Sequence, residues 1–137
     1  EYLNQISPLE QCIKATDVDN LHIMTRGKSP ANPSEMLSSE RFREMLDLLS
    51  QQYDHIIIDT PPVLAVTDSI IIAQYSGVNL VVARYAKTQI KELELTISRF
   101  DQAGVKVNGF ILNDIQRTSG SSYGYNYAYA YTANKDD

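Results

Sequence analysis

Apolar side chains recur at two spacings along the first 115 residues, and the two spacings predict alternating helices and strands. Four apolar residues at helical spacing predict one amphipathic helix between residues 32 and 52: Phe42, Met45, Leu46 and Leu49. The run Asn32–Glu35 marks the expected start of this helix. It offers an N-cap side chain, a proline suited to the first turn, and an acid that can complete a capping box.

Short runs of mostly apolar residues predict three buried strands, at Ile56–Ile58, Val78–Ala83 and Val105–Leu112, and a weaker fourth strand covers residues 21–25. Two further helices are expected between the three buried strands. One spans Asp68–Gln74 and stops near Ser76-Gly77, and the other has Thr88 as its cap and ends at Gly104. A helix between successive buried strands is typical of a parallel sheet covered on both faces. The sequence therefore predicts an α/β fold with a doubly wound parallel sheet.

Composition and charge narrow the classes of function. The 137 residues carry 17 acidic and 12 basic side chains, a formal net charge of −5, and no Lys/Arg cluster, so nothing favours a nucleic-acid partner. One cysteine, Cys12, excludes an intrachain disulfide. The wholly apolar runs fall far short of the roughly 20 residues that a membrane-spanning helix needs. Because the chain begins at Glu1 rather than at methionine, we expect it to be a piece of a longer protein.

A change in composition near residue 116 predicts two parts, a folded part over residues 1–115 and a flexible tail over residues 116–137. Five tyrosines alternate with small or polar residues in this tail: Tyr123, Tyr125, Tyr127, Tyr129 and Tyr131. Period-two aromatics would suit an edge strand, and an aromatic-rich segment could instead drive self-association. A third interpretation is a set of phosphoacceptors, since small neighbours leave each hydroxyl accessible to a kinase.

The segment Ile56–Pro62 carries the strongest candidate for chemistry. Its apolar run leads to Asp59, at the end of a predicted strand where open α/β sheets bind their ligands. Two prolines then stop the strand and stiffen the turn. An aspartate placed this way holds Mg²⁺ in nucleotide-binding proteins, directly or through water, and the metal bridges phosphate oxygens. The alternative is that Asp59 only caps the turn. The segment favours a P-loop NTPase-like fold whose phosphate loop and N-terminal strands are missing from this chain.

The triplet Gly27-Lys28-Ser29 superficially resembles the end of a phosphate-binding loop. The glycine expected five residues before Gly27 is replaced by His22, and Pro30 follows at once instead of a helix. A phosphate loop must open directly into a helix so that N–H groups face the phosphates. We therefore interpret the triplet as a surface loop and expect this chain alone not to bind ATP tightly.

Two further residues follow predicted strands and are weaker candidates for a nucleotide site. Asn113 could contact the base, although a turn role is at least as compatible with its position. Arg84 could contact a phosphate or simply be a solvated charge. Asp68 could approach the metal, but a helix N-cap is the simpler interpretation.

These segments together resemble the cytoplasmic autokinase domain of bacterial tyrosine kinases that act in capsule and exopolysaccharide export. The resemblance rests on Arg26-Gly27 with Asn32–Glu35, on Tyr53–Pro62, and on three later runs that precede the tyrosine cluster: Val81–Arg84, Gln102–Val105 and Gly109–Asn113. It implies a protein-tyrosine kinase that uses ATP and Mg²⁺, with Asp59 as the acid of the Walker B element. The Walker A loop and the second acidic motif would lie upstream, so the resemblance implies that this chain alone is inactive.

The same resemblance implies partners and a location. The five terminal tyrosines would be phosphorylated in trans by a neighbouring subunit of a homo-oligomeric ring at the cytoplasmic face of the inner membrane. A low-molecular-weight protein-tyrosine phosphatase would reverse the modification, and the cycle would regulate the polysaccharide export machinery. Two other functions stay open at this point. They are a partitioning-type or Mrp-like ATPase of the same deviant P-loop fold, and a non-catalytic interaction domain that is phosphorylated in trans.

Overall fold

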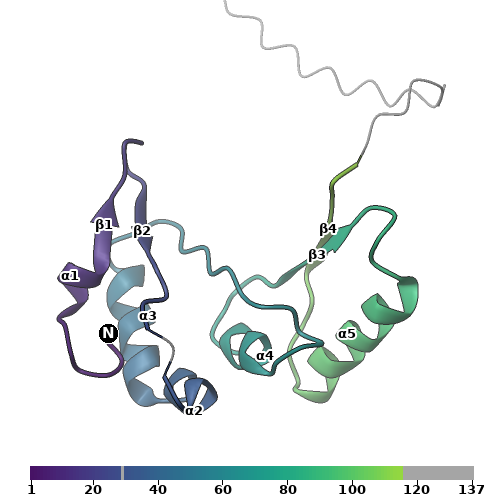
Figure 1. The fold of residues 1–137 in the computed structure, drawn as a ribbon, viewed down its shortest axis with the longest axis horizontal. Helices are drawn as coiled ribbons and strands as arrows, with labels where there is room; N and C mark the ends of the chain where they lie inside the picture. The colour runs from purple at the N-terminus through teal and green to yellow at the C-terminus, as the bar shows by residue number, and fades with distance from the viewer. Residues whose placement is uncertain (29, 116–137) are drawn as a thin grey trace, which may run out of the picture.

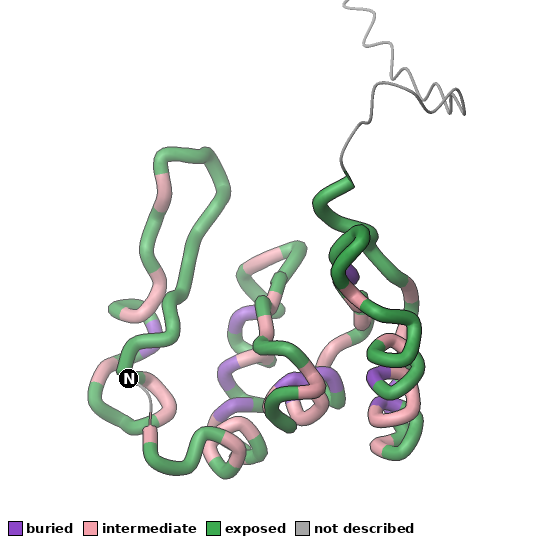
Figure 2. Tube along the Cα trace, turned by 45° about the vertical axis from the view of Figure 1, so that its right-hand side comes forward, coloured by how far each residue is buried: buried purple, intermediate pink, exposed green. Residues whose placement is uncertain are grey.

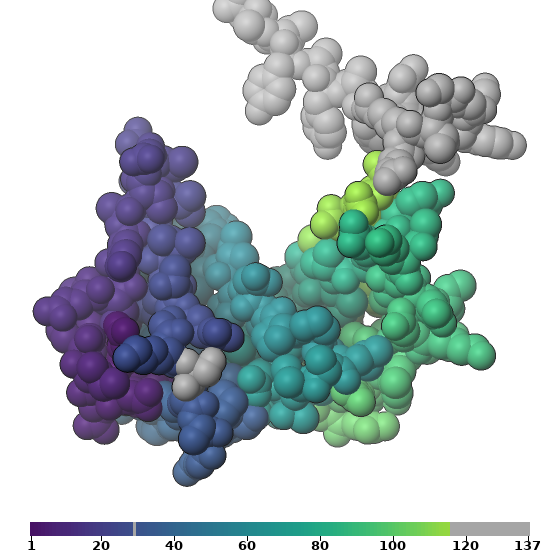
Figure 3. Space-filling model, in the orientation of Figure 1, coloured from purple at the N-terminus to yellow at the C-terminus, as the bar shows by residue number. Residues whose placement is uncertain are grey.

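The computed structural model describes residues 1–28 and 30–115, and its two small sheets rise on opposite sides of the molecule with most of the helices below them (Figure 1). The chain forms, in order, α1 (Leu9–Cys12), β1 (Ile13–Ala15), β2 (His22–Met24), α2 (Pro33–Leu37), α3 (Glu40–Ser50), α4 (Asp68–Ala73), β3 (Leu80–Arg84), α5 (Ile90–Gln102) and β4 (Gly109–Asn113). In the space-filling view, the N-terminal segment (purple) and the later segment (green) project upward at opposite sides of the molecule (Figure 3).

The first sheet is an antiparallel hairpin of β1 and β2, in which Ile13 lies opposite Met24. The Thr16 hydroxyl and the Thr16 amide both donate to the Leu21 carbonyl, at 2.9 and 3.2 Å, and close the turn. The strand predicted over residues 21–25 is therefore confirmed in β2. Its partner β1 was not predicted, since three residues are too few to show an alternating pattern.

The second sheet pairs β3 with β4 in parallel, and α5 connects the two strands. Arg84 is the register partner of Asn113, so both residues lie at the carboxyl ends of their strands. The prediction of two parallel strands joined by a helix is confirmed, with both strands shifted toward the C-terminus.

The strand predicted at Ile56–Ile58 is wrong for the residues that the structure describes. These residues pair with no strand, and Ile57 is 93% exposed. An apolar run becomes a strand only where a neighbouring strand supplies hydrogen-bond partners for its N–H and C=O groups. Among residues 1–28 and 30–115, β3 and β4 pair only with each other.

The helix predicted between residues 32 and 52 is divided into α2 and α3. Ser39 starts the second helix, because its hydroxyl accepts a hydrogen bond from the Phe42 amide at 3.3 Å. Pro33 does occupy the first turn of α2, as predicted. The Asn32 side chain does not cap that helix; its amide donates instead to the Glu35 carboxylate at 3.1 Å.

The predicted boundaries of the later helices need two corrections. Gln89, not Thr88, is the N-cap residue of α5, and its backbone amide donates to the Glu92 carboxylate at 2.7 Å. The Thr88 hydroxyl accepts from the Arg84 amide at 2.9 Å and so belongs to the preceding turn.

Asp68 lies in the first turn of α4, after Thr67 at the cap position, and α4 ends before Ser76-Gly77. Gly104 follows α5 with φ +68°, which confirms the predicted helix stop.

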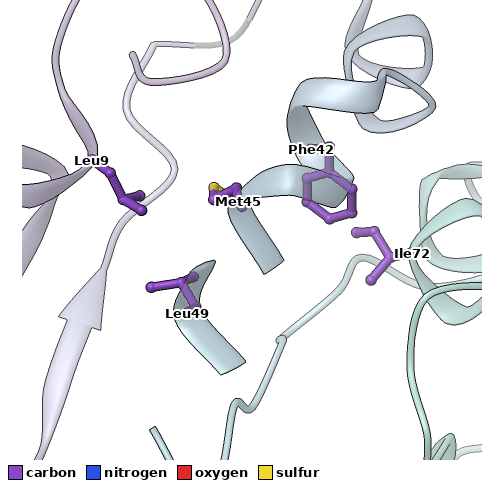
Figure 4. Close-up of a cluster of buried hydrophobic side chains, with 5 residues drawn as sticks. All are labelled: Leu9, Phe42, Met45, Leu49 and Ile72. Carbon is purple, nitrogen blue, oxygen red and sulfur yellow. The ribbon is translucent and has the colours of Figure 1, made fainter. Parts of the chain in front are cut away.

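Two clusters of buried side chains hold these elements together. Most of the buried positions, purple in Figure 2, lie in the helices. The first joins α1, α3 and α4 through Leu9, Phe42, Met45, Leu49 and Ile72 (Figure 4). The second joins α4 to α5 and the segment after it through Ala73, Phe100 and Val105. Since α4 contributes to both clusters, it is the structural link between the two halves of the chain.

Among residues 1–28 and 30–115, helices cover one face of the β3–β4 sheet, and there mainly β3, because Phe110 and Leu112 of β4 are 53% and 52% exposed. Val81 packs against the second cluster and Ala83 is buried, whereas Leu80 and Val82 on the opposite face are 54% and 61% exposed. Helices on both faces were predicted. The described residues therefore show a smaller arrangement, a two-stranded parallel sheet with helices on one side.

Candidate functional site

Asp59 lies in an extended segment between the two clusters. Ile58, the residue before it, packs against the first cluster, and Val63, four residues after it, packs against the second. Asp59 itself is exposed. Within residues 1–28 and 30–115, no hydrogen bond or ion pair engages its carboxylate. The carboxylate is thus held near the fold at both ends of its segment and is accessible to a ligand.

Two side chains from helices fix the loop that follows Asp59. The Ser69 hydroxyl, on α4, donates a hydrogen bond to the Pro61 carbonyl. The Arg99 guanidinium, on α5, donates through Nη1 to the Val63 carbonyl at 2.8 Å. A short turn inside the loop adds a bond from the Ala65 amide to the Pro62 carbonyl at 2.9 Å. These contacts give the loop a defined path.

Sequence reasoning did not identify Ser69 or Arg99 as part of this site. The available signal was weak: each is a polar residue on the inward face of an amphipathic helix. Ser69 is 3% exposed and Arg99 is half-buried. A buried polar group needs a hydrogen-bond partner, but the sequence does not show which carbonyl supplies it.

Asp68 takes part in a contact between two helices. Its carboxylate accepts a hydrogen bond from the Ser34 hydroxyl at 2.8 Å, and this bond joins the start of α2 to the start of α4. That contact accounts for the residue without a metal.

Arg84 and Asn113 lie at the ends of their strands, as predicted, and the parallel pairing of β3 and β4 brings the two residues together. Arg84 Nε lies 2.6 Å from Asp114 Oδ2 in an exposed ion pair. Asn113 Oδ1 accepts from the Asp114 amide at 2.8 Å, and its carbonyl accepts from the Tyr85 amide at 2.9 Å. In the described part of the chain, neither side chain forms a hydrogen bond or ion pair with Asp59. The predicted contacts with base and phosphate stay predictions.

The donor set around Asp59 is compatible with Mg²⁺. No group of three or more His, Cys, Asp or Glu side chains gathers into a metal cage among residues 1–28 and 30–115. Mg²⁺ does not require such a cage, because it keeps several waters and binds one or two carboxylates together with substrate phosphates. A single accessible aspartate fits this mode.

Two other features were predicted from the sequence, the tyrosine cluster and the loop at Gly27. The tyrosines Tyr123, Tyr125, Tyr127, Tyr129 and Tyr131 lie outside the described residues. The loop around Gly27 does not open into a helix, since α2 begins only at Pro33. That spacing agrees with the surface-loop interpretation of Gly27-Lys28-Ser29.

Comparison with known proteins places the chain in a family. Residues 1–109 match a family model described as an AAA domain. The chain is 68% identical over 119 residues to the tyrosine-protein kinase ptk of Acinetobacter johnsonii. It is also 49% identical over 125 residues to the tyrosine-protein kinase wzc of Salmonella typhimurium. The chain belongs to the bacterial tyrosine kinases of the AAA-domain family.

Solved kinase domains of this family share the fold. The kinase domain of the Escherichia coli tyrosine kinase ETK superposes with a TM-score of 0.80 at 38% identity, over 91% of this chain and 50% of that one. The BceF tyrosine kinase domain gives a TM-score of 0.78 at 39% identity, over 85% of this chain and 48% of that one. The folded segments described here thus correspond to about half of a bacterial tyrosine-kinase domain.

The matched share of the full-length relatives is smaller. The match to the Acinetobacter kinase spans 87% of this chain and 16% of that protein, and the match to the Salmonella kinase spans 90% of this chain and 17% of that protein.

Among the helices of residues 1–28 and 30–115, none combines the length and apolar character needed to cross a bilayer.

Proposed function

We propose that this chain forms the metal-binding, tail-bearing half of an ATP-dependent protein-tyrosine autokinase that acts in capsule or exopolysaccharide export. The observation that carries the proposal is the 68% identity to a tyrosine-protein kinase across 87% of the chain. Such similarity to proteins named tyrosine kinases favours this function over a partitioning-type ATPase of related fold. Residues 1–115 would form part of the catalytic domain, and residues 116–137 would form a flexible acceptor tail.

Asp59 would hold Mg²⁺, directly or through water. Its exposed carboxylate, free of protein partners among the described residues, supports this role. When bound, the metal supplies a positive charge that neutralises the phosphate oxygens of ATP. Asp59 would orient that charge, and the loop after it would keep the carboxylate in place. Arg84 and Asn113, side by side at the ends of β3 and β4, would contact phosphate and base.

The five tail tyrosines, Tyr123 to Tyr131, would accept phosphate from a neighbouring subunit. A ring of identical subunits at the cytoplasmic face of the inner membrane would present each tail to the next active site. A low-molecular-weight protein-tyrosine phosphatase would remove the phosphates. Other segments of the kinase domain would supply the ATP-phosphate loop, because none is recognisable in this sequence.

The metal role is tested by Asp59→Asn in a complete kinase domain that includes these residues. Loss of an electrostatic group at the reacting phosphate should lower the rate of phosphotransfer on the order of 100-fold. The matched control is Asp54→Asn, which removes an exposed carboxylate five residues earlier. Radiolabelled ATP measures the transfer. Equal rates for the Asp59 and Asp54 variants would contradict the metal assignment.

The acceptor role is tested by mixing two variants of that domain. One carries Asp59→Asn with an intact tail; the other is active but has all five tail tyrosines replaced by Phe. Phosphotyrosine on the first protein, detected by antibody, is expected because transfer occurs between subunits. As a control for other acceptors, Tyr85→Phe removes an exposed tyrosine of the folded part. If the Asp59→Asn protein carries as much phosphotyrosine after its own five tail tyrosines are also replaced by Phe, the tail assignment is refuted.

A further inference from the structure

Two polar side chains reach the loop after Asp59 from two different helices, and no role in the proposed reaction accounts for them. Ser69 comes from α4 and Arg99 from α5. They donate hydrogen bonds to the Pro61 and Val63 carbonyls, two and four residues after Asp59. We propose that Ser69 and Arg99 are positioning residues for Asp59, which fix the carboxylate where it meets its metal. This inference rests on the proposed metal role of Asp59.

The Ser69 contact is the more deeply buried of the two. Ser69 is 3% exposed on a helix whose neighbouring residues Ile72 and Ala73 belong to the two core clusters. A serine there has no access to water, so its hydroxyl depends on the Pro61 carbonyl as its acceptor. Pro61 has a fixed φ and no N–H. The serine therefore holds a stiff segment directly adjacent to the Asp59-Thr60 pair.

The Arg99 contact fixes the far side of the same loop. Arg99 is half-buried near the end of α5, one residue before the buried Phe100. Its Nη1 donates to the Val63 carbonyl at 2.8 Å, and the Val63 side chain packs into the second cluster. A charged donor makes a stronger hydrogen bond than a neutral one. The carbonyl and the side chain of Val63 are thus both held in place.

Together the two bonds connect the loop to both helices of the second half. A carboxylate that must meet a metal at a defined position loses affinity when its supporting groups are free to move. The side chain of Asp59 has no hydrogen bond of its own among the described residues. Its position therefore depends on the backbone before and after it, and these two helices hold the backbone after it.

The test measures metal binding rather than turnover, in a complete kinase domain that includes these residues. Mn²⁺ replaces Mg²⁺ as a paramagnetic probe, and electron paramagnetic resonance gives its dissociation constant in the presence of ADP. Ser69→Ala and Arg99→Gln should each raise that constant by about 3- to 10-fold, at or just below the low end of the range known for direct supports of metal ligands. Arg99→Lys, which retains a charged donor, should recover at least half of the loss on a logarithmic scale.

Two matched controls separate positioning from general destabilisation. Thr96→Ala removes another buried hydroxyl, which donates to the Glu92 carbonyl within α5 and does not touch the loop. Arg41→Gln removes another half-buried arginine, whose Nε donates to the Tyr2 carbonyl at 2.9 Å. Both should leave the Mn²⁺ constant within about 2-fold, a change well below that expected of a ligand support, even where they lower the melting temperature as much as the loop variants do.

Asp59→Asn, alone and combined with Ser69→Ala or Arg99→Gln, distinguishes a failure of the metal role from a failure of the positioning role. If Ser69 and Arg99 act through Asp59, their substitution should not weaken Mn²⁺ binding further once Asp59→Asn is present. Unchanged Mn²⁺ binding in Asp59→Asn alone would overturn the metal role itself. A weakened constant in Asp59→Asn, with Ser69→Ala and Arg99→Gln no different from their controls, would overturn only the positioning role.

Discussion

Within the first cluster, Phe42 of α3 packs toward α4. Truncating Phe42 should lower the free energy of unfolding more than truncating an exposed apolar residue on the same helix. The ring is 5% exposed and lies between Met45 and Ile72, with Leu9 beyond Met45 (Figure 4). It also meets the Tyr75 ring edge to face, with centroids 5.6 Å apart and planes at 76°. Phe42→Ala therefore removes the contacts of α3 to α4 and to Tyr75 just after it.

The expected loss follows from this burial. Replacing a buried phenylalanine by alanine costs about 3–5 kcal/mol of unfolding free energy, through lost apolar transfer and the cavity left behind. Phe42→Leu keeps most of the volume and loses the aromatic contact, so about 1 kcal/mol is expected. Leu48→Ala is the control on the same helix: Leu48 is 44% exposed, and its truncation should cost less than about 1 kcal/mol.

Urea unfolding of a complete kinase domain that includes these residues measures the change in stability for each of the three variants. Far-ultraviolet circular dichroism follows the loss of helix. The slopes of the transitions should agree, so that the midpoints report stability. A Phe42→Ala loss below about 1.5 kcal/mol, or one equal to that of Leu48→Ala, would refute the reasoning. It would mean that the first cluster does not join α3 to α4 in the intact domain.

Three smaller substitutions test local features by the same measurement. Gly104→Ala should cost about 1–2 kcal/mol, because φ is +68° there and the strain is in the backbone, with no atom within 4 Å of the added Cβ; a neutral result would contradict that conformation. Glu92→Ala should cost about 1 kcal/mol by removing the carboxylate that accepts from the Gln89 amide at 2.7 Å, and equal stability would show that α5 starts elsewhere. Asp114→Asn should change stability by less than about 1 kcal/mol, since its pair with Arg84 is exposed; a larger loss would show that the pair is buried in the intact domain.

The long helical patterns were predictable because each encodes one buried face. Phe42, Met45 and Leu49 are spaced for a helix and are all buried in α3. The sequence pattern continued across residues 38 and 39 and so missed the break between α2 and α3, which depends on the Ser39 hydroxyl accepting from a backbone amide. The strand predicted at Ile56–Ile58 was wrong for a different reason. Its apolar residues indicate burial in a sheet, but strand formation requires a hydrogen-bonded neighbour that residues 1–28 and 30–115 do not place beside it.

Asp59 could be selected from the sequence because an apolar run, an acid and two prolines form a distinctive local pattern. The sequence also identified the ends of two strands, where Arg84 and Asn113 proved to be register partners. Tertiary structure alone decided that Ser69 and Arg99 meet the loop after Asp59, from 8 and 36 residues away in the chain. Local patterns determine helix faces and turns, because both depend on neighbours in sequence. The support of a carboxylate by buried donors depends on how helices pack, and no local spacing records that.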